Sequence, residues 1–171
     1  TIRIYLHTIR KANEGFAAYI EAHGEEAKQR GVAIGYDNRH MSPEFAMDSA
    51  KVLAKHGIRS YVFESLRPTP ELSFAVRHLN CFGGIMVTAS HNPKEYNGYK
   101  LYDEKGCQLV PALAQQVIDR VNAVKDELAI TADVTPEEEK LITVIGKEVD
   151  EEYYKNVLSI QLNPDVNKDD I

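Results

Sequence analysis

Three short apolar runs, each bounded by glycine or polar residues, stand out in the first half of the chain. They are GVAIGYD, SYVFE and GGIMVTA, at 31–37, 60–64 and 83–89. Runs of this length and composition predict buried strands. Residues 97–110 predict an extended pair with a turn near Lys105 and Gly106, and residues 142–146 an edge strand.

The segments between these runs carry apolar residues at the spacing of amphipathic helices. In residues 8–24, one helical face collects Ile9, Ala12, Phe16, Tyr19 and Ile20, and Gly24 is a stop signal. The other predicted helices are 42–57, 69–79, 111–128 and 150–160. Ser42 and Thr69 precede prolines and are predicted N-caps, and Thr135 forms a capping-box pattern with Glu138.

This alternation of buried strands and amphipathic helices indicates an α/β domain with a largely parallel sheet. The 171 residues, 43% of them hydrophobic, are enough for one domain with a sizeable core. The net charge of −6 argues against non-specific binding to nucleic acid or to an anionic membrane. Cys81 and Cys107 form no CxxC pair, and neither a membrane-spanning run nor a signal peptide is visible. We therefore expect a cytoplasmic protein.

Polar residues gather immediately after the third predicted strand. The stretch TASHNPKEYNGYK, residues 88–100, places Ser90 in a loop beyond the carboxyl end of that strand. Ligands of open α/β sheets bind at this edge. Phosphoryl chemistry suits the composition, because Lys94, Lys100 and Arg39 supply cations for a transferring phosphoryl group. Arg39 follows the first strand, which a parallel sheet brings to the same edge.

Each of these residues also has an ordinary structural interpretation. A serine in a loop is usually a turn residue, and His91 before Asn92-Pro93 is compatible with turn chemistry. Lys94 and Lys100 fit solvated surface positions, and Arg39 fits a structural partner of Asp37. The spacing alone therefore predicts no more than an anion site at a strand end.

The loop also resembles a known family. TASHNP followed by NGYK is similar to the phosphoserine loop of the α-D-phosphohexomutases, the phosphoglucomutase and phosphomannomutase family. GYDNRHMS at 35–42 resembles the G-x-D-x-R segment of that family, and RPTPELSFAVRHL at 67–79 its T-P helix start. TIRKANEGFAAYI and NGYKLYDEKGCQL are most similar to the branch that contains phosphoglucomutases and phosphopentomutases. The resemblance covers nearly the whole chain.

The resemblance implies a fold and a function. Members have four domains around one cleft, and this chain looks like the first, a three-layer α/β/α unit with a mainly parallel, mixed four-stranded sheet. Residues 1–160 would form that domain, and residues 161–171 would begin the linker to a second domain. Hexose 1-phosphate and hexose 6-phosphate would interconvert through a phosphoserine and a sugar bisphosphate.

The same resemblance assigns roles to single residues. Ser90 would carry the phosphoryl group, Lys100 would act as general acid and base, and His91 would support it. Arg39, Asn97 and Lys94 would bind the substrate or its phosphate. Mg²⁺ would bind the phosphate on Ser90 together with ligands from the second domain, and glucose 1,6-bisphosphate would act as activator. Arg3 is a loose match to an arginine ahead of the first helix.

Parts of the family pattern are absent from the sequence. The G-T-x-G-x-R-G segment and the D-G-D-x-D-R metal loop do not occur. The chain also begins at Thr1 rather than Met, so we expect a fragment that does not turn over alone and that works with the remaining domains of its polypeptide. A phosphopentomutase, a non-catalytic module that binds sugar phosphates, and a serine hydrolase remain alternatives.

Overall fold

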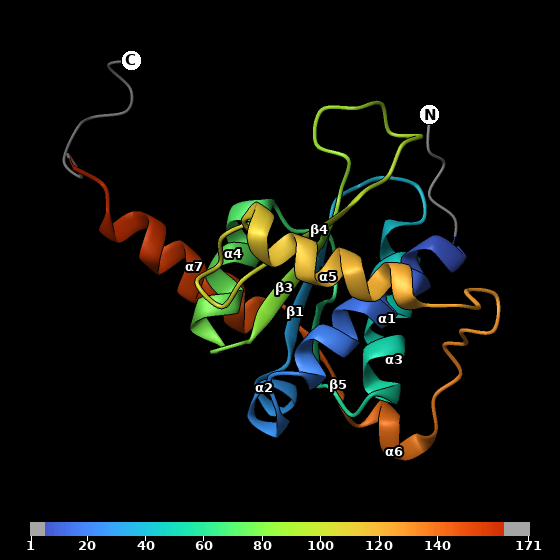
Figure 1. Cartoon of the computed structure of the whole chain (residues 1–171). Coiled ribbons are helices and arrows are strands. Elements are labelled where there is room, and N and C mark those ends of the chain that lie inside the picture. The colour runs from blue at the N-terminus through green and yellow to red at the C-terminus, as the bar shows by residue number, and fades with distance from the viewer. Residues whose placement is uncertain (1–5, 163–171) are drawn as a thin grey trace.

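The computed structural model describes residues 6–162, which form a mixed sheet with helices on both faces (Figure 1). In chain order the elements are α1 (Leu6–Glu21), α2 (Glu25–Arg30), β1 (Val32–Tyr36), α3 (Ser42–Lys55), β2 (Ser60–Phe63), α4 (Thr69–His78), β3 (Gly83–Val87), β4 (Tyr99–Tyr102), α5 (Pro111–Ala123), α6 (Pro136–Glu139), β5 (Ile142–Ile145) and α7 (Lys147–Ser159). The sheet order is β4-β3-β1-β2-β5. All pairings are parallel except that of β3 with β4.

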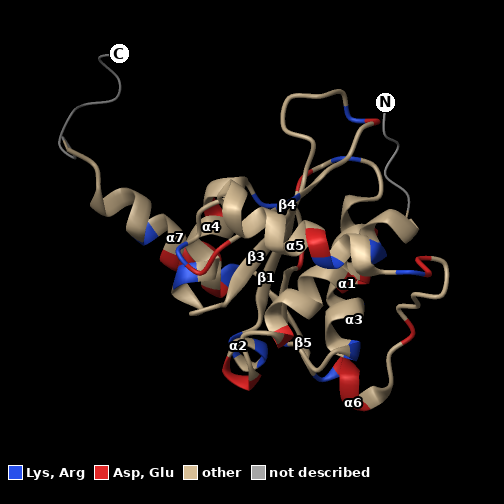
Figure 2. Cartoon of the chain, in the orientation of Figure 1, with Lys and Arg blue, Asp and Glu red and all other residues tan. Residues whose placement is uncertain are grey.

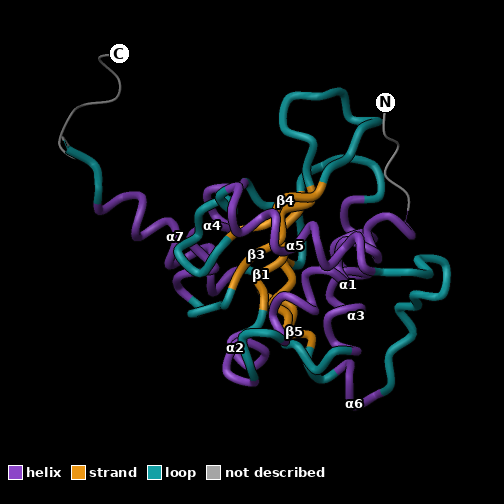
Figure 3. Tube along the Cα trace, viewed as in Figure 1, coloured by secondary structure: helices purple, strands orange, loops and turns teal. Residues whose placement is uncertain are grey.

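Two apolar cores enclose the central strands, one on each face of the sheet. On one face α1, α3 and α5 pack over side chains that include Phe16, Ile20, Ile34, Leu53 and Ile85. On the other face α4 and α7 cover side chains that include Phe63, Leu72, Val76, Met86 and Val149. The central strands β1 and β3 are buried along their whole length, as strands covered on both faces must be. Figure 3 shows the strands in orange with the helices around them in purple.

The predicted three-layer α/β/α architecture is therefore confirmed, but the strand number of four is wrong. Residues 142–145 form β5, which pairs in parallel with β2 and makes a fifth, edge strand. The apolar pattern at 142–146 predicted this strand, whereas the resemblance did not. The predicted extended pair at 97–110 is confirmed in part: β4 is a strand, and a single bridge joins Tyr102 to Gln108.

Two predicted helix boundaries are wrong, and one helix was not predicted. α5 ends at Ala123, because the Asp126 carboxylate accepts the backbone N–H groups of Leu128 and Ala129 and so closes a local turn. α7 begins at Lys147 rather than Asp150. The short helix α2 lies between Gly24 and Gly31, a region that carried no strong apolar period.

Of the three predicted N-caps, one is confirmed. Thr135 and Glu138 form the capping box of α6. Ser42 is instead the first residue of α3, after Met41, and its hydroxyl is directed to other partners. Thr69 likewise begins α4, with Pro68 at the cap position.

Some predictions lie outside the described residues. Arg3 and nearly all of the predicted linker, residues 163–171, fall there, so the boundary at residue 160 stays a prediction. Among residues 6–162 no helix combines the length and apolarity needed to cross a membrane.

Candidate functional site

The parallel pairing of β1 and β3 brings two polar loops together at one edge of the sheet. Tyr36 at the end of β1 lies beside Val87 at the end of β3. The loop after β1 carries Asp37 and Arg39, and the loop after β3 carries Ser90. The sequence-based expectation that Arg39 and Ser90 share this edge is confirmed.

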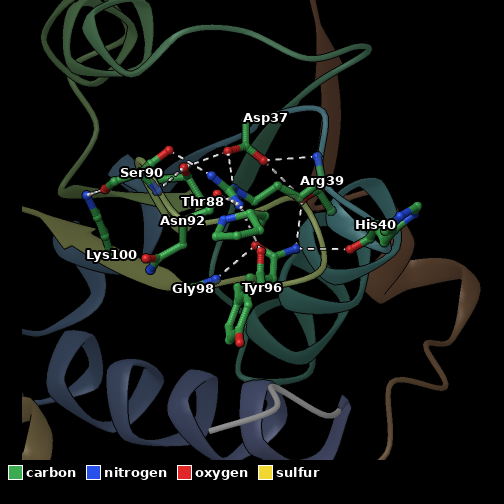
Figure 4. Close-up of polar contacts among 12 residues, drawn as sticks. Asp37, Arg39, His40, Thr88, Ser90, Asn92, Tyr96, Gly98 and Lys100 are labelled. Atoms are coloured by element: carbon green, nitrogen blue, oxygen red, sulfur yellow. Dashed lines mark hydrogen bonds and ion pairs between the residues drawn. The ribbon is translucent and has the colours of Figure 1, made fainter. Parts of the chain in front are cut away.

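Asp37 is the acceptor at the centre of these contacts (Figure 4). Its carboxylate accepts hydrogen bonds from the Thr88 hydroxyl at 2.6 Å, from the Ser42 hydroxyl at 3.3 Å and from the backbone N–H of Arg39 at 3.1 Å. Thr88 Oγ1 in turn accepts the backbone N–H of Ser90 at 3.0 Å. A short chain of hydrogen bonds therefore joins the end of β1 to the backbone of Ser90.

Arg39 holds the loop from its other side. Its side chain is buried, and Nε donates to Asp37 Oδ2 at 2.8 Å. Nη2 donates to the carbonyl of Ser90 at 2.7 Å. Nη1 donates to the carbonyls of Asn92, Pro93 and Tyr96, at 2.7, 2.7 and 3.1 Å. The guanidinium thus fixes the conformation of the loop, which bears out the simpler interpretation of Arg39 as a structural partner of Asp37.

Ser90 has a left-handed backbone, with φ of 58°. This conformation costs a residue with a Cβ roughly 1–2 kcal/mol, so it persists because Thr88 and Arg39 hold the peptide groups on both sides. It leaves the side chain exposed, and Lys100 Nζ donates a hydrogen bond to Ser90 Oγ. Lys100 reaches the serine because β4 runs antiparallel to β3, which places Lys100 opposite Met86.

Asn97 closes the base of the loop. Its amide group donates to Ser42 Oγ at 2.8 Å and to the carbonyl of His40 at 3.1 Å, and its carbonyl accepts the N–H of Gly98 at 2.9 Å. Gly98 passes so close to the Thr88 carbonyl oxygen that a Cβ would lie 2.4 Å from it. A glycine is therefore required at this position.

The predicted site residues divide into two groups. Ser90, Lys100, Arg39 and Asn97 are brought together through direct or shared contacts. His91 and Lys94 are exposed on the outer side of the loop and make no side-chain hydrogen bond or ion pair with the rest of residues 6–162. Thr88 was not predicted as a site residue, although a hydroxyl two residues before Ser90 is a known local partner for its backbone N–H.

The described residues do not form a metal site by themselves. Among residues 6–162, no three His, Cys, Asp or Glu side chains are arranged to hold a metal ion.

A cavity of about 680 Å³ lies between α3 and β2, beside Tyr36 and Asp48, and it includes no residue of the Ser90 loop. Ser90 itself is exposed, in the loop that follows β3.

Comparison with known proteins agrees with this arrangement. Residues 3–128 match the family model described as phosphoglucomutase/phosphomannomutase, alpha/beta/alpha domain I. The chain belongs to the phosphoglucomutase/phosphomannomutase family. A phosphoglucomutase of Staphylococcus epidermidis is 42% identical over 156 residues, which are 91% of this chain and 28% of the relative. A phosphoglucomutase of Staphylococcus saprophyticus is 41% identical over 160 residues, again 28% of its length.

Solved structures agree with the fold. A protein from Thermus thermophilus described as a phosphomannomutase superposes with a TM-score of 0.68 at 27% identity, over 91% of this chain and 32% of that one. A phosphoglucomutase/phosphomannomutase family protein from Burkholderia thailandensis gives a TM-score of 0.67 at 21% identity, over 92% and 32%. The chain therefore spans less than a third of the proteins that it resembles.

Proposed function

We propose that Ser90 accepts and donates a phosphoryl group in the interconversion of hexose 1-phosphate and hexose 6-phosphate. The observation that carries this proposal is the contact between Lys100 Nζ and Ser90 Oγ at the carboxyl edge of the sheet. The serine is exposed, its backbone is held in a fixed conformation, and a cation lies against its oxygen. This combination suits a phosphate carrier, because a cation stabilises the charge of the transferring group.

Lys100 would handle the proton of the transfer, because its Nζ contacts Ser90 Oγ. When the phosphoryl group moves from Ser90 to a sugar hydroxyl, the O–P bond at Ser90 breaks and a new O–P bond forms on the sugar. The hydroxyl proton must then reach the Ser90 oxygen. An amine that already contacts this oxygen can pass the proton, and in the return step it can take the proton back.

The other predicted residues serve this function in two ways. Arg39 and Asn97 act through the loop, because their donors are engaged by its carbonyls and by Ser42. His91 and Lys94 lie on its exposed side, where they can meet the phosphate or the sugar. Their contribution is to binding, with His91 as a supporting acid or base.

Mg²⁺ and the remaining domains belong to the same proposal. The described residues offer the ion no ligand set of their own, so the phosphate on Ser90 would be one ligand and the others would come from a second domain. The 171-residue chain alone is then expected to lack turnover. We propose glucose 1,6-bisphosphate as the activator. We also propose that the protein works in the cytoplasm.

The test is the intact mass of the full-length polypeptide that contains this chain, after incubation with glucose 1,6-bisphosphate. We expect a gain of one phosphate that maps to Ser90 and disappears in Ser90→Ala. Lys100→Met should slow labelling, whereas Lys105→Met, at an exposed position in the turn after β4, should not. Turnover of glucose, mannose and ribose phosphates then identifies the sugar and separates a hexose mutase from a phosphopentomutase.

A different result would overturn the proposal. If Ser90 gains no phosphate under conditions that label a known mutase, the phosphoserine mechanism is wrong. Retained binding of a sugar phosphate in that case would identify a non-catalytic module.

A further inference from the structure

The outer half of α7 presents an apolar surface that the described structure leaves uncovered. The inner half is anchored: Val149 is 1% exposed, the Tyr153 ring lies 5.6 Å from that of Phe74, and Arg67 donates to Asp150 at 2.7 Å. Every residue from Tyr154 to Leu162 is exposed. In Figure 1 this half of the helix extends away from the sheet.

The uncovered half is unusually apolar for an exposed helix. Within the helix the exposed fractions are 56% for Tyr154, 43% for Val157 and 65% for Leu158, and just beyond its end they are 70% for Ile160 and 92% for Leu162. Tyr154, Val157 and Leu158 are spaced i, i+3 and i+4, so they share one side of the helix.

Charge is distributed unevenly along α7. Lys155 is the one charged residue in the sequence from Tyr153 to Leu162, whereas KEVDEE at 147–152 is almost entirely charged. Figure 2 shows the change of composition along the helix. Depletion of charge together with aromatic and aliphatic side chains is typical of the buried centre of an interface.

The length of the relatives indicates what covers this surface. The similarity to the phosphoglucomutases extends over 91% of this chain but reaches only 28% of their length. α7 is the last helix of the described chain, and its exposure rises toward the end. Further polypeptide in such a protein would therefore start next to the uncovered side. A membrane surface fits less well, because helices that bind membranes carry several basic residues.

We propose that Tyr154, Val157 and Leu158 form a docking surface for a later part of the same polypeptide, beyond Leu162. A neighbour with an apolar face would bury these three side chains and fix the direction in which the chain leaves the domain. The ion pair of Arg67 with Asp150 holds the base of the helix, so docking at its outer half orients the neighbour relative to the sheet. This inference does not depend on the phosphoserine chemistry.

Cysteine labelling tests the proposal. The background carries Cys107→Ser, because Cys107 is exposed, while Cys81 is buried and remains. Leu158→Cys probes the docking surface, and Ser159→Cys is the matched control one residue further on, turned by about 100° around the helix. Both variants are made in the 171-residue chain and in the full-length polypeptide, and their reaction with a maleimide is followed over time.

In the 171-residue chain we expect both thiols to react at similar rates. In the full-length polypeptide Leu158→Cys should react more slowly than Ser159→Cys by about tenfold or more, since a buried thiol reacts only after local opening. Tyr154→Cys should give the same protection and guards against an effect peculiar to one variant. Equal rates in the full-length polypeptide would overturn the proposal. Protection that depends on concentration in the 171-residue chain would also overturn it, because a second copy would then be the partner.

Discussion

The guanidinium of Arg39 and the carboxylate of Asp37 form an ion pair of 2.8 Å, and together they hold the loop that carries Ser90. Asp37 reaches the backbone N–H of Ser90 through the Thr88 hydroxyl. Arg39 reaches its carbonyl directly. The two residues stand two positions apart in the sequence, so one short segment after β1 sets the geometry of a loop that follows β3.

Replacing Arg39 by lysine should release this loop. Lysine keeps the charge but cannot supply the fork of donors that meets Asp37 and four carbonyls. We expect Arg39→Lys to lower the free energy of unfolding by about 2 kcal/mol, since several buried hydrogen bonds are lost. Urea denaturation measures the stability, and hydrogen exchange of residues 88–98 measures the order of the loop.

Lys94→Ala is the control, because Lys94 is an exposed cation of the same loop. We expect its effect to stay within about 0.5 kcal/mol, with unchanged hydrogen exchange. Unchanged exchange in Arg39→Lys would show that other contacts fix the loop.

The left-handed backbone of Ser90 predicts that a serine here costs stability, although the proposed function needs its hydroxyl. Glycine adopts this conformation without a steric penalty, whereas serine and alanine do not. Ser90→Gly should therefore be more stable than Ser90→Ala by about 1 kcal/mol, although both variants lose the phosphoryl acceptor. Thermal unfolding of the two variants measures the difference. Equal stability would mean that the loop relaxes when the hydroxyl is removed.

Features of the site that depend on the order of the strands could be predicted from the sequence. Features that depend on the direction of single side chains could not. Alternating apolar runs were enough to place Arg39 and Ser90 at one edge, because parallel strands end together. No pattern in the sequence shows that the Arg39 guanidinium turns toward backbone carbonyls. Ser42 was predicted as a cap, but its hydroxyl donates to Asp37 and accepts a hydrogen bond from Asn97.

The helices and strands, too, could be predicted from the sequence only in part. The strand at 142–145 was visible in its apolar residues, but its pairing with β2 was not predicted and is seen only in the structure. The end of α5 was not visible, because a local turn at Asp126 outweighs the helical pattern that continues to Leu128.

The Tyr99 hydroxyl belongs to a chain of side-chain hydrogen bonds beside the site, so its removal should lower stability. The Tyr99 hydroxyl donates to Asn13 Oδ1 at 2.6 Å, and Asn13 Nδ2 donates to Ser49 Oγ at 2.9 Å. Burial raises the pKa of Tyr99 far above its ordinary value, so the phenol stays a donor. Tyr99→Phe leaves Asn13 without this partner and should cost about 1–3 kcal/mol in unfolding free energy.

Tyr61→Phe provides the comparison, since Tyr61 is partly exposed and its hydroxyl makes no hydrogen bond within residues 6–162. We expect a change below about 0.5 kcal/mol for this variant. Urea denaturation of the two proteins measures the difference. Similar losses in both would show that the bond to Asn13 adds nothing to stability.

Glu71 predicts a dependence of stability on pH. The side chain is 2% exposed, and its Oε1 lacks a hydrogen-bond partner within the described residues. Burial, and then the neighbouring Asp150 carboxylate, raise the pKa of Glu71 to about 7, and Arg67, whose Nε lies 3.8 Å from Glu71 Oε1, only partly offsets this. A protonated Glu71 can donate to Asp150, whose own pKa is lowered by the hydrogen bond from Arg67.

The raised pKa of Glu71 and the lowered pKa of Asp150 make stability fall with pH in opposite directions. Because the pKa of Glu71 is raised in the folded state, its contribution to stability is fully present below its ordinary pKa and is lost as the pH rises through about 7. The contribution of Asp150 is lost only in acid, as the pH falls through its lowered pKa. His56 adds a further decline on the alkaline side, because burial lowers its pKa less than the hydrogen bonds and negative charges of Glu21 and Glu14 together raise it.

Glu71→Gln separates Glu71 from these other groups, since His56 and Asp150 are common to both proteins. Glutamine resembles the protonated acid at every pH. The stability gained by the variant relative to the parent should therefore grow by about 1–2 kcal/mol between about pH 5 and pH 8. Urea denaturation across this range measures it. Glu26→Gln, at an exposed position of α2, should show a difference that does not change with pH. If the difference for Glu71→Gln is also flat, Glu71 is already ionised at about pH 5, and Arg67 rather than a proton balances its charge.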